Sequence, residues 1–188
     1  MSKSNYFAGS FVLVLPAFIL FVIGYAFYEC DFIRYTNPAS GTRVYRGIWT
    51  YPRVSDGYCV EYPQGTDLDS SWVSARVFWI LGCVVGVLSI MLNLPACFTE
   101  RSRIVSALGP GWMMTSVSFG LTFLQLNSDV CKENGGCGIS KFAYFLIPGI
   151  VLSSLASLVC FRAYAEQKNE VSLGLEDSVA MEEPFLSA

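Results

Sequence analysis

The sequence predicts an all-α membrane protein, an antiparallel four-helix transmembrane bundle with a small β-rich, disulfide-stapled first extracellular loop. Only 14% of the 188 residues are charged, whereas soluble domains carry about a quarter. Four apolar stretches occupy roughly half of the chain, and no charged residue falls inside them. At ~1.5 Å per helical residue, each stretch is long enough to cross a hydrocarbon core of ~30 Å. The four stretches are 6–28, 77–98, 104–126 and 142–161.

These stretches divide the chain into a membrane domain, 1–163, and an acidic tail, 164–188. Two outer loops, 29–76 and 127–141, join the first helix to the second and the third to the fourth. The connection 99–103 is so short that the second and third helices must form an antiparallel hairpin. The first stretch exceeds a signal-peptide core in length, so we expect an uncleaved helix rather than a cleaved signal. We expect the tail, with six acidic residues against one lysine, to be disordered.

Four of the seven cysteines fall in the two outer loops, at Cys30, Cys59, Cys131 and Cys137. Four cysteines on one face predict two disulfides and an oxidising compartment. The sequence allows three pairings. Cys131 and Cys137 are close enough to form a small ring, whose turn the two glycines between them would ease, and this leaves Cys30 with Cys59.

The cysteines also predict the sidedness of the protein. They place the outer loops outside the cell or in a lumen and both termini in the cytosol. The count of lysine and arginine points the other way, with five on the predicted cytosolic side and seven on the outer side. Arg101 and Arg103 in the short connection support the predicted orientation locally. We take the cysteines as decisive and expect an integral protein of the plasma membrane or an endomembrane.

The first outer loop has the pattern of a small antiparallel sheet. Residues 42–51 alternate polar and apolar, Asp56-Gly57 signals a turn, and 58–62 form a second short strand. Gly47-Ile48-Trp49 lies in the first strand, and Ala75-Arg76 precedes the second apolar stretch. These motifs, together with the four-helix topology, resemble the claudin and peripheral-myelin-protein superfamily. That family has a Gly-Leu-Trp motif followed by two cysteines in its first outer loop, and an arginine before its second helix.

The resemblance implies structural roles for several residues. Gly47 and Trp49 would anchor the loop sheet against the helices, and Arg76 would mark the start of the second helix. Cys59 would be one half of the disulfide staple. The family's first cysteine falls where this chain has residues 50–53, so Cys30 would have to replace it. The second-loop cysteine pair is a further departure from the family.

Small residues spaced four apart mark the predicted helices. Such spacing lets helix backbones approach closely in lipid, where packing drives association. The simplest interpretation is packing within one bundle, and contacts between copies or with other membrane proteins are the alternative. Besides the lipid bilayer, we therefore expect membrane-protein partners in the same membrane or self-association. The small residues are Gly82 and Gly86, Ser116 and Gly120, and Gly149 and Ser153.

The sequence offers little catalytic chemistry. It contains no histidine, the commonest metal ligand and proton shuttle, and no aspartate, glutamate, lysine or arginine inside a predicted span. Four loop acids, Asp56, Glu61, Asp67 and Asp69, do not match an EF-hand spacing, and solvated charges are the simpler interpretation. We expect no enzyme activity, no metal site and no cofactor. No basic cluster suggests nucleic-acid binding.

Two functional classes remain. The first is a non-enzymatic, claudin-like four-pass protein that acts in membrane organisation, in cell adhesion or as an auxiliary subunit of a membrane complex. The second is a small channel or transporter. For this alternative, Gly109-Pro110-Gly111 and Pro148-Gly149 would interrupt the third and fourth helices around a substrate.

Overall fold

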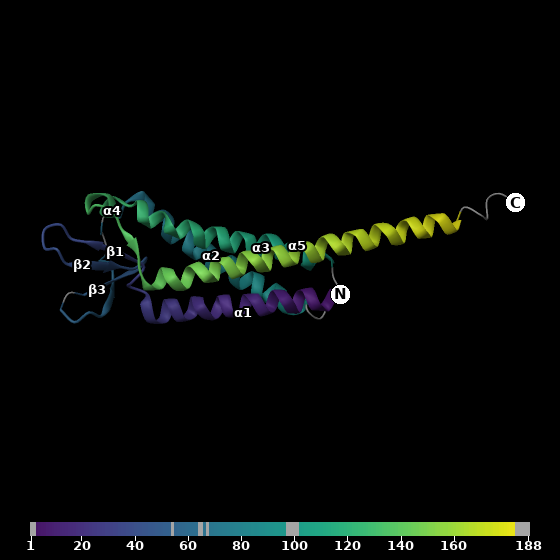
Figure 1. The fold of residues 1–188 in the computed structure, drawn as a ribbon, viewed down its shortest axis with the longest axis horizontal. Coiled ribbons are helices and arrows are strands. Elements are labelled where there is room, and N and C mark those ends of the chain that lie inside the picture. The colour runs from purple at the N-terminus through teal and green to yellow at the C-terminus, as the bar shows by residue number, and fades with distance from the viewer. Residues whose placement is uncertain (1–2, 54, 64–65, 67, 97–101, 183–188) are drawn as a thin grey trace.

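The computed structural model describes residues 3–182 except 54, 64–65, 67 and 97–101. Most of the described chain is helical, with all the strands gathered at one end (Figure 1). The N-terminus of the first helix and the C-terminal end of the last helix both lie at the opposite end. The long helices are α1 (Lys3–Tyr28), α2 (Ser70–Ala96), α3 (Ser102–Leu121) and α5 (Lys141–Glu182).

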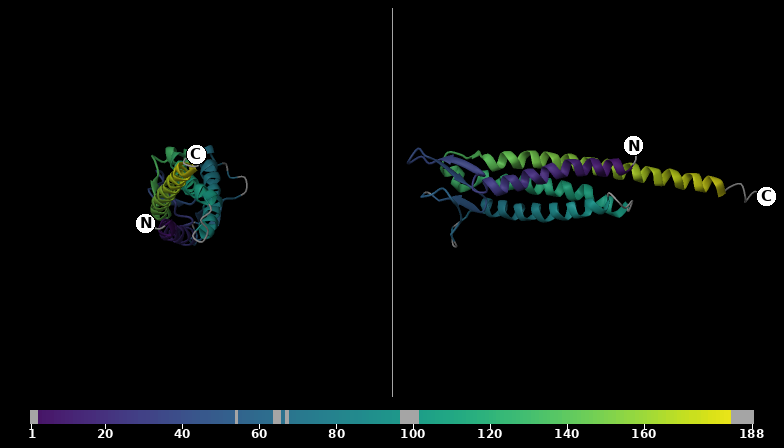
Figure 2. Two further views of the ribbon diagram at one scale, coloured as in Figure 1. Left: turned by 90° about the vertical axis from the view of Figure 1, so that its right-hand side faces the viewer. Right: turned by 90° about the horizontal axis from the view of Figure 1, so that it is seen from below.

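The long helices lie side by side in the order α1, α5, α3, α2 (Figure 2). Helices α1 and α2 contact each other only sparsely, so the arrangement is more open between them. Trp79 of α2 lies where the helices meet, with its ring 4.9 Å from Phe21 of α1, 5.4 Å from Phe119 of α3 and 5.3 Å from Phe142 of α5 between centroids. Interlocking aromatic rings of this kind fix the helices relative to one another.

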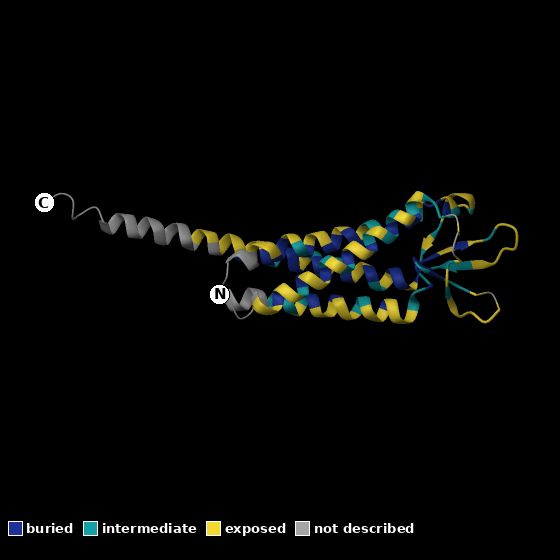
Figure 3. Cartoon of the chain, turned by 180° about the vertical axis from the view of Figure 1, so that it is seen from behind, coloured by how far each residue is buried: buried dark blue, intermediate teal, exposed yellow. Residues whose placement is uncertain are grey.

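Three of the described helices are long and apolar enough to cross a membrane. They are Gly9–Tyr28, Ser70–Pro95 and Lys141–Glu166. Their outward faces carry large exposed apolar side chains, while the buried residues face inward (Figure 3). Such a wide apolar exterior is typical of lipid contact rather than of a water-soluble surface. The protein is thus a membrane protein with at least three membrane-length helices.

The outer loops form two small antiparallel sheets. Strand β1 (Ile33–Thr36) lies between β2 (Arg43–Arg46) and β5 (Gly138–Ile139), and β3 (Thr50–Pro52) pairs with β4 (Cys59–Glu61). We call 29–69 together with 128–140 the outer platform. The predicted strand 42–51 is therefore divided at Gly47-Ile48-Trp49 between two sheets. The register breaks there because Gly47 donates its N–H to Thr50 O at 2.8 Å and forms a tight turn.

Helix α2 begins earlier than its apolar stretch predicts. It starts at Ser70 rather than at residue 77, because Asp69 Oδ1 accepts the backbone N–H of Trp72 at 2.8 Å and caps the first turn. Arg76 consequently lies in the second turn of α2, not at its boundary. The predicted end of this helix at Phe98 lies outside the described residues.

The two proline motifs do not interrupt their helices. Pro110 lies inside α3 and Pro148 inside α5. Ser157 Oγ donates to Gly109 O at 2.8 Å, so a hydroxyl from the neighbouring helix satisfies a carbonyl beside Pro110. This bond ties α5 to α3 at the motif, and α3 runs without a break from Ser102 to Leu121. The expectation that Gly109-Pro110-Gly111 interrupts the third helix is therefore wrong.

The C-terminal segment is also more regular than its composition predicts. Helix α5 continues to Glu182, whereas the sequence predicts disorder from residue 164. The segment continues a helix that is already nucleated, and Ala165, Glu166 and Lys168 are good helix formers.

The predicted third span, 104–126, changes after Leu121 into a 3₁₀ helix, η1 (Thr122–Asn127), which leads to the short α4 (Asp129–Glu133).

Two disulfides staple the outer platform. Cys30 is joined to Cys59 and Cys131 to Cys137, with Cα atoms 5.8 and 5.0 Å apart. The first bond ties the end of α1 to β4, and the second closes the loop between α4 and β5. Of the three pairings that the sequence allows, this is the one found.

We predict that alkylation followed by non-reducing peptide mapping recovers Cys30 linked to Cys59 and Cys131 linked to Cys137. The Cα separations of both pairs lie within the range of ordinary disulfides, about 4.4–6.8 Å. Cys83 and Cys160, which are free thiols, serve as internal controls and should become alkylated once the protein is unfolded. Recovery of any linkage between the two pairs would contradict the fold of the platform.

Candidate functional site

The junction between the outer platform and the helices centres on two adjacent carbonyl oxygens. Gly47 O accepts from Gln125 Nε2 at 3.2 Å and from Tyr62 Oη at 3.3 Å. Ile48 O accepts from Arg76 Nε at 2.9 Å and from Trp72 Nε1 at 3.1 Å. The four donors come from α2, η1 and the end of the first loop, so one turn holds three segments together.

Gly47 has no space for a larger side chain. A Cβ atom at this position would lie 1.9 Å from Glu29 O and 2.9 Å from Cys30 Cα. Both atoms belong to the backbone just beyond α1, which is fixed by the disulfide of Cys30. The turn therefore packs directly on the end of α1, and only glycine allows that approach.

Trp49, the loop anchor that the resemblance implies, and Arg76, the residue that it places at the start of the second helix, lie against each other. The guanidinium carbon of Arg76 is 4.8 Å from the centre of the Trp49 ring and 5.4 Å from that of Tyr62. These are cation–π distances. Trp49 is only half-buried, and its neighbour Ile48 is the residue that enters the core, at 2% exposure.

Trp72, which the sequence analysis did not single out, is the most deeply buried tryptophan at the junction. It is 1% exposed, and its ring packs edge-on against Tyr62 at 5.7 Å between centroids. The missed signal is the aspartate three residues before it: Asp69 begins the helix and so places Trp72 in its first turn. An acidic residue followed by Ser70 and Ser71 is a recognisable helix start.

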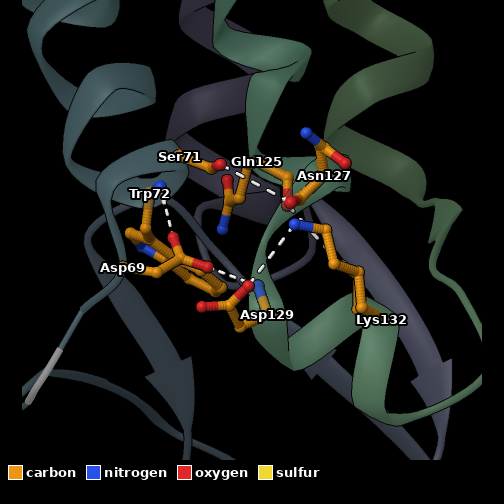
Figure 4. A network of polar contacts seen from close by, with 8 residues as sticks. Asp69, Ser71, Trp72, Gln125, Asn127, Asp129 and Lys132 are labelled. Atoms are coloured by element: carbon orange, nitrogen blue, oxygen red, sulfur yellow. Dashed lines mark hydrogen bonds and ion pairs between the residues drawn. The ribbon is translucent and has the colours of Figure 1, made fainter.

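Asp69 also joins the two outer loops (Figure 4). Its Oδ2 accepts the backbone N–H of Asp129 at the start of α4, while Lys132 Nζ lies 3.4 Å from Asp129 Oδ1. Ser71 Oγ is 3.5 Å from Asn127 O, a weaker contact in the same network. The carboxylate of Asp69 therefore caps one helix and fixes the beginning of another.

Burial determines the protonation of Tyr62. Removal from water raises the pKa of the Tyr62 phenol to about 12, although nearby Arg46 and Arg76 act in the opposite direction. The phenol is accordingly neutral at physiological pH and keeps the proton that it donates to Gly47 O.

Two open cavities flank Trp49 on the side of the platform that faces the helices. The acidic cavity lies beside the end of α1, and the arginine cavity lies beside α2. Trp49 and Glu61 line both, so the cavities are neighbours. The acidic cavity is lined by Tyr25, Glu29, Trp49, Thr50, Cys59 and Glu61. The arginine cavity is lined by Trp49, Glu61, Tyr62, Pro63, Thr66, Leu68 and Arg76.

A third cavity lies among the helices at mid-length and is almost entirely apolar. Residues of α1, α2, α3 and α5 line it, among them Phe18, Gly82, Gly86 and Trp112. Among the described residues that line it, none is ionisable apart from Cys83.

The predicted small-residue positions differ in their surroundings. A Cβ on Gly82 would lie 2.7 Å from the Phe119 ring, one on Gly86 3.3 Å from Thr115, and one on Gly149 3.6 Å from Ala17 O. Ser116 Oγ lies 3.0 Å from Trp112 O in its own helix and 3.4 Å from Ile150 O of α5, and Ser153 Oγ bonds within its own helix to Gly149 O. Gly120 is exposed, with no atom within 4 Å of a Cβ.

The described residues contain no group of three histidine, cysteine, aspartate or glutamate side chains placed to hold a metal ion. Asp56 pairs with Arg53 at 3.3 Å and Asp69 acts as described above, while Asp67 lies outside the described residues. No known protein-family model matches the chain, and no curated protein matches it either.

We predict that Gly47→Ala lowers the stability of the protein by about 3 kcal/mol, because the methyl group would overlap the backbone at Glu29. The measurement is the thermal unfolding temperature in detergent, together with surface expression in cells. Gly120→Ala is the matched control and should lower neither, since that position is open and alanine is the better helix former inside α3. Equal unfolding temperatures for the two variants would contradict the packing of this turn on α1.

We further predict that Trp72→Phe destabilises the protein by about 1 kcal/mol more than Trp112→Phe does. Both tryptophans are buried, but Trp72 Nε1 donates to Ile48 O whereas Trp112 Nε1 has no hydrogen-bond partner among the described residues. Chemical or thermal unfolding of the two variants side by side measures the difference. An equal or larger loss in Trp112→Phe would contradict the stabilising role given to the Trp72 hydrogen bond.

Proposed function

We propose that this chain is a non-enzymatic four-pass membrane protein that acts through contacts of its outer platform with membrane proteins, in membrane organisation, cell adhesion or as an auxiliary subunit. The observation that carries the proposal is the rigid attachment of an exposed platform to membrane-length helices through the carbonyls of Gly47 and Ile48. A platform fixed in this way presents its tips at a defined height and angle, as a recognition surface requires.

The fourth span in this proposal is α3 together with η1. Helix α3 packs along both α2 and α5, and its Met113, Met114 and Val117 are exposed in the same manner as the outward residues of the other helices. Exposed apolar side chains on all the long helices support a four-helix transmembrane bundle. The claudin-like resemblance of the Gly47-Ile48-Trp49 motif agrees with this architecture.

The orientation in this proposal places the outer platform outside the cell or in a lumen and both termini in the cytosol. The two disulfides favour that side, because cytosolic thiols are kept reduced. An even number of spans then returns the C-terminus to the side of the N-terminus.

The contact surface that we propose is the tip of the β3–β4 hairpin. The tip turns at Gly57, which has φ +73°, and presents Tyr58 with 73% of its surface exposed. Tyrosine combines apolar area with a hydroxyl and is enriched at protein interfaces. Tyr58 is held by its backbone, since its N–H donates to Asp56 Oδ1 at 3.2 Å, which leaves the ring available.

The transport alternative receives less support. It requires helices that are interrupted around a substrate, but α3 and α5 are both continuous. The cavity among the helices also has an apolar lining. A solute pathway through a membrane ordinarily carries polar or charged groups.

We predict that Tyr58→Ala reduces association with partner membrane proteins about fivefold or more, while folding and surface level stay unchanged. Association is measured in two assays, as aggregation of mixed cell populations and as co-purification of membrane proteins from one population. Tyr144→Ala, which removes an exposed tyrosine of α5, is the control. If the unmodified protein at matched surface levels gives no signal in either assay, the proposed contact function is wrong.

A further inference from the structure

The acidic and arginine cavities together offer complementary charges at the membrane boundary. Glu29 and Glu61 line the first, Arg76 lines the second, and Trp49 is shared. We propose that this pair of cavities binds the headgroup of phosphatidylethanolamine, with the ammonium in the acidic cavity and the phosphate beside Arg76. This site goes beyond the proposed contact function, since it concerns a lipid rather than a protein partner.

The acidic cavity contains two carboxylates without a cationic partner. The ion pairs between described residues are Arg53 with Asp56, Lys132 with Asp129 and Lys141 with Asp31, and none involves Glu29 or Glu61. Two unpaired carboxylates that line one cavity repel each other and attract a cation. The rings of Tyr25 and Trp49 line the same cavity, and aromatic faces also attract ammonium groups.

A buried hydroxyl in the same cavity lacks a hydrogen-bond partner. Thr50 is only 8% exposed, its Oγ1 is fully buried, and no donor or acceptor reaches it among the described residues. An unsatisfied buried polar atom is costly and often marks a place where a ligand belongs. With the two carboxylates, Thr50 provides three acceptor groups, and a primary ammonium carries three N–H donors. This match favours ethanolamine over choline, whose methyl groups donate no hydrogen bond.

Arg76 provides the phosphate partner. Its Nε is engaged with Ile48 O, and no hydrogen bond or ion pair found among the described residues uses its terminal amino groups. The stacking of the guanidinium on Trp49, at 4.8 Å, holds it in place beside Glu61. A planar guanidinium with free N–H groups is the preferred side chain for phosphate.

The position of the site selects a lipid rather than a free solute. Tyr25 lies in the last turn of α1, within the membrane-length segment Gly9–Tyr28, and Arg76 lies in the second turn of α2. Both side chains are therefore at the depth where a lipid headgroup meets water. The exposed apolar faces of the two helices below the site would contact the acyl chains.

The test is native mass spectrometry of the purified full-length protein in detergent. Phosphatidylethanolamine, phosphatidylcholine and phosphatidylglycerol with identical acyl chains are added in equal amounts. We expect phosphatidylethanolamine adducts to exceed phosphatidylglycerol adducts about fivefold or more. The double variant Glu29→Gln/Glu61→Gln should lose this preference, and Thr50→Val should reduce it. Glu133→Gln, an exposed carboxylate of α4 that lines neither cavity, is the matched control and should retain it.

Each result decides the proposal. Equal binding of phosphatidylethanolamine and phosphatidylglycerol, or a preference that survives in Glu29→Gln/Glu61→Gln, would overturn the site. Equal binding of phosphatidylethanolamine and phosphatidylcholine would overturn the assignment to ethanolamine. The unfolding temperature and the two disulfides of each variant establish that it is folded. Because the assay needs no protein partner, its outcome is independent of the cell-association experiments.

Discussion

The attachment of the platform to the helices depends on four hydrogen bonds, which the adjacent carbonyls of Gly47 and Ile48 accept. A strand that broke register at this turn would leave buried backbone oxygens without donors, which is costly in a region shielded from water. Here the donors come from Trp72, Arg76, Tyr62 and Gln125. The chain can therefore pass at this turn from β2 in one sheet to β3 in the other, while the turn itself stays buried against the end of α1. Loss of that arrangement would detach both sheets from the helices.

Below this junction, contacts between aromatic side chains hold the membrane-length helices together. Trp79 touches aromatic side chains from α1, α3 and α5, and Phe142 joins the same cluster to Phe32 at the edge of the platform. Lipid offers no hydrophobic force to hold helices together, so close packing of such shapes has to do so. The platform and the adjoining parts of the helices consequently share one hydrophobic core.

A protein built in this way separates two kinds of surface. The helices expose apolar side chains around their outer faces, while the platform exposes turns, charged groups and Tyr58 at its tips. The boundary between them contains Trp49 stacked against Arg76. The proposed role in recognition would use the surface of the platform and would require no moving part. The continuous α3 and α5 are consistent with that rigid design.

The sequence alone determined the membrane class, three of the membrane-length helices, the position of an outer sheet and the pairing of cysteines that local spacing favoured. These follow from short-range properties: length, hydropathy, alternation and ring size. It gave Gly47, Trp49 and Arg76 structural roles only through a family resemblance, and it misread the two proline motifs as breaks. Tertiary structure alone decided that 42–51 divides between two sheets, that β1 and β5 pair across the loops, and that Trp72 and Gln125 converge on one turn. Those outcomes depend on donors and acceptors far apart in the chain, such as Gln125 and Gly47, and no local pattern encodes which distant group will satisfy a buried carbonyl.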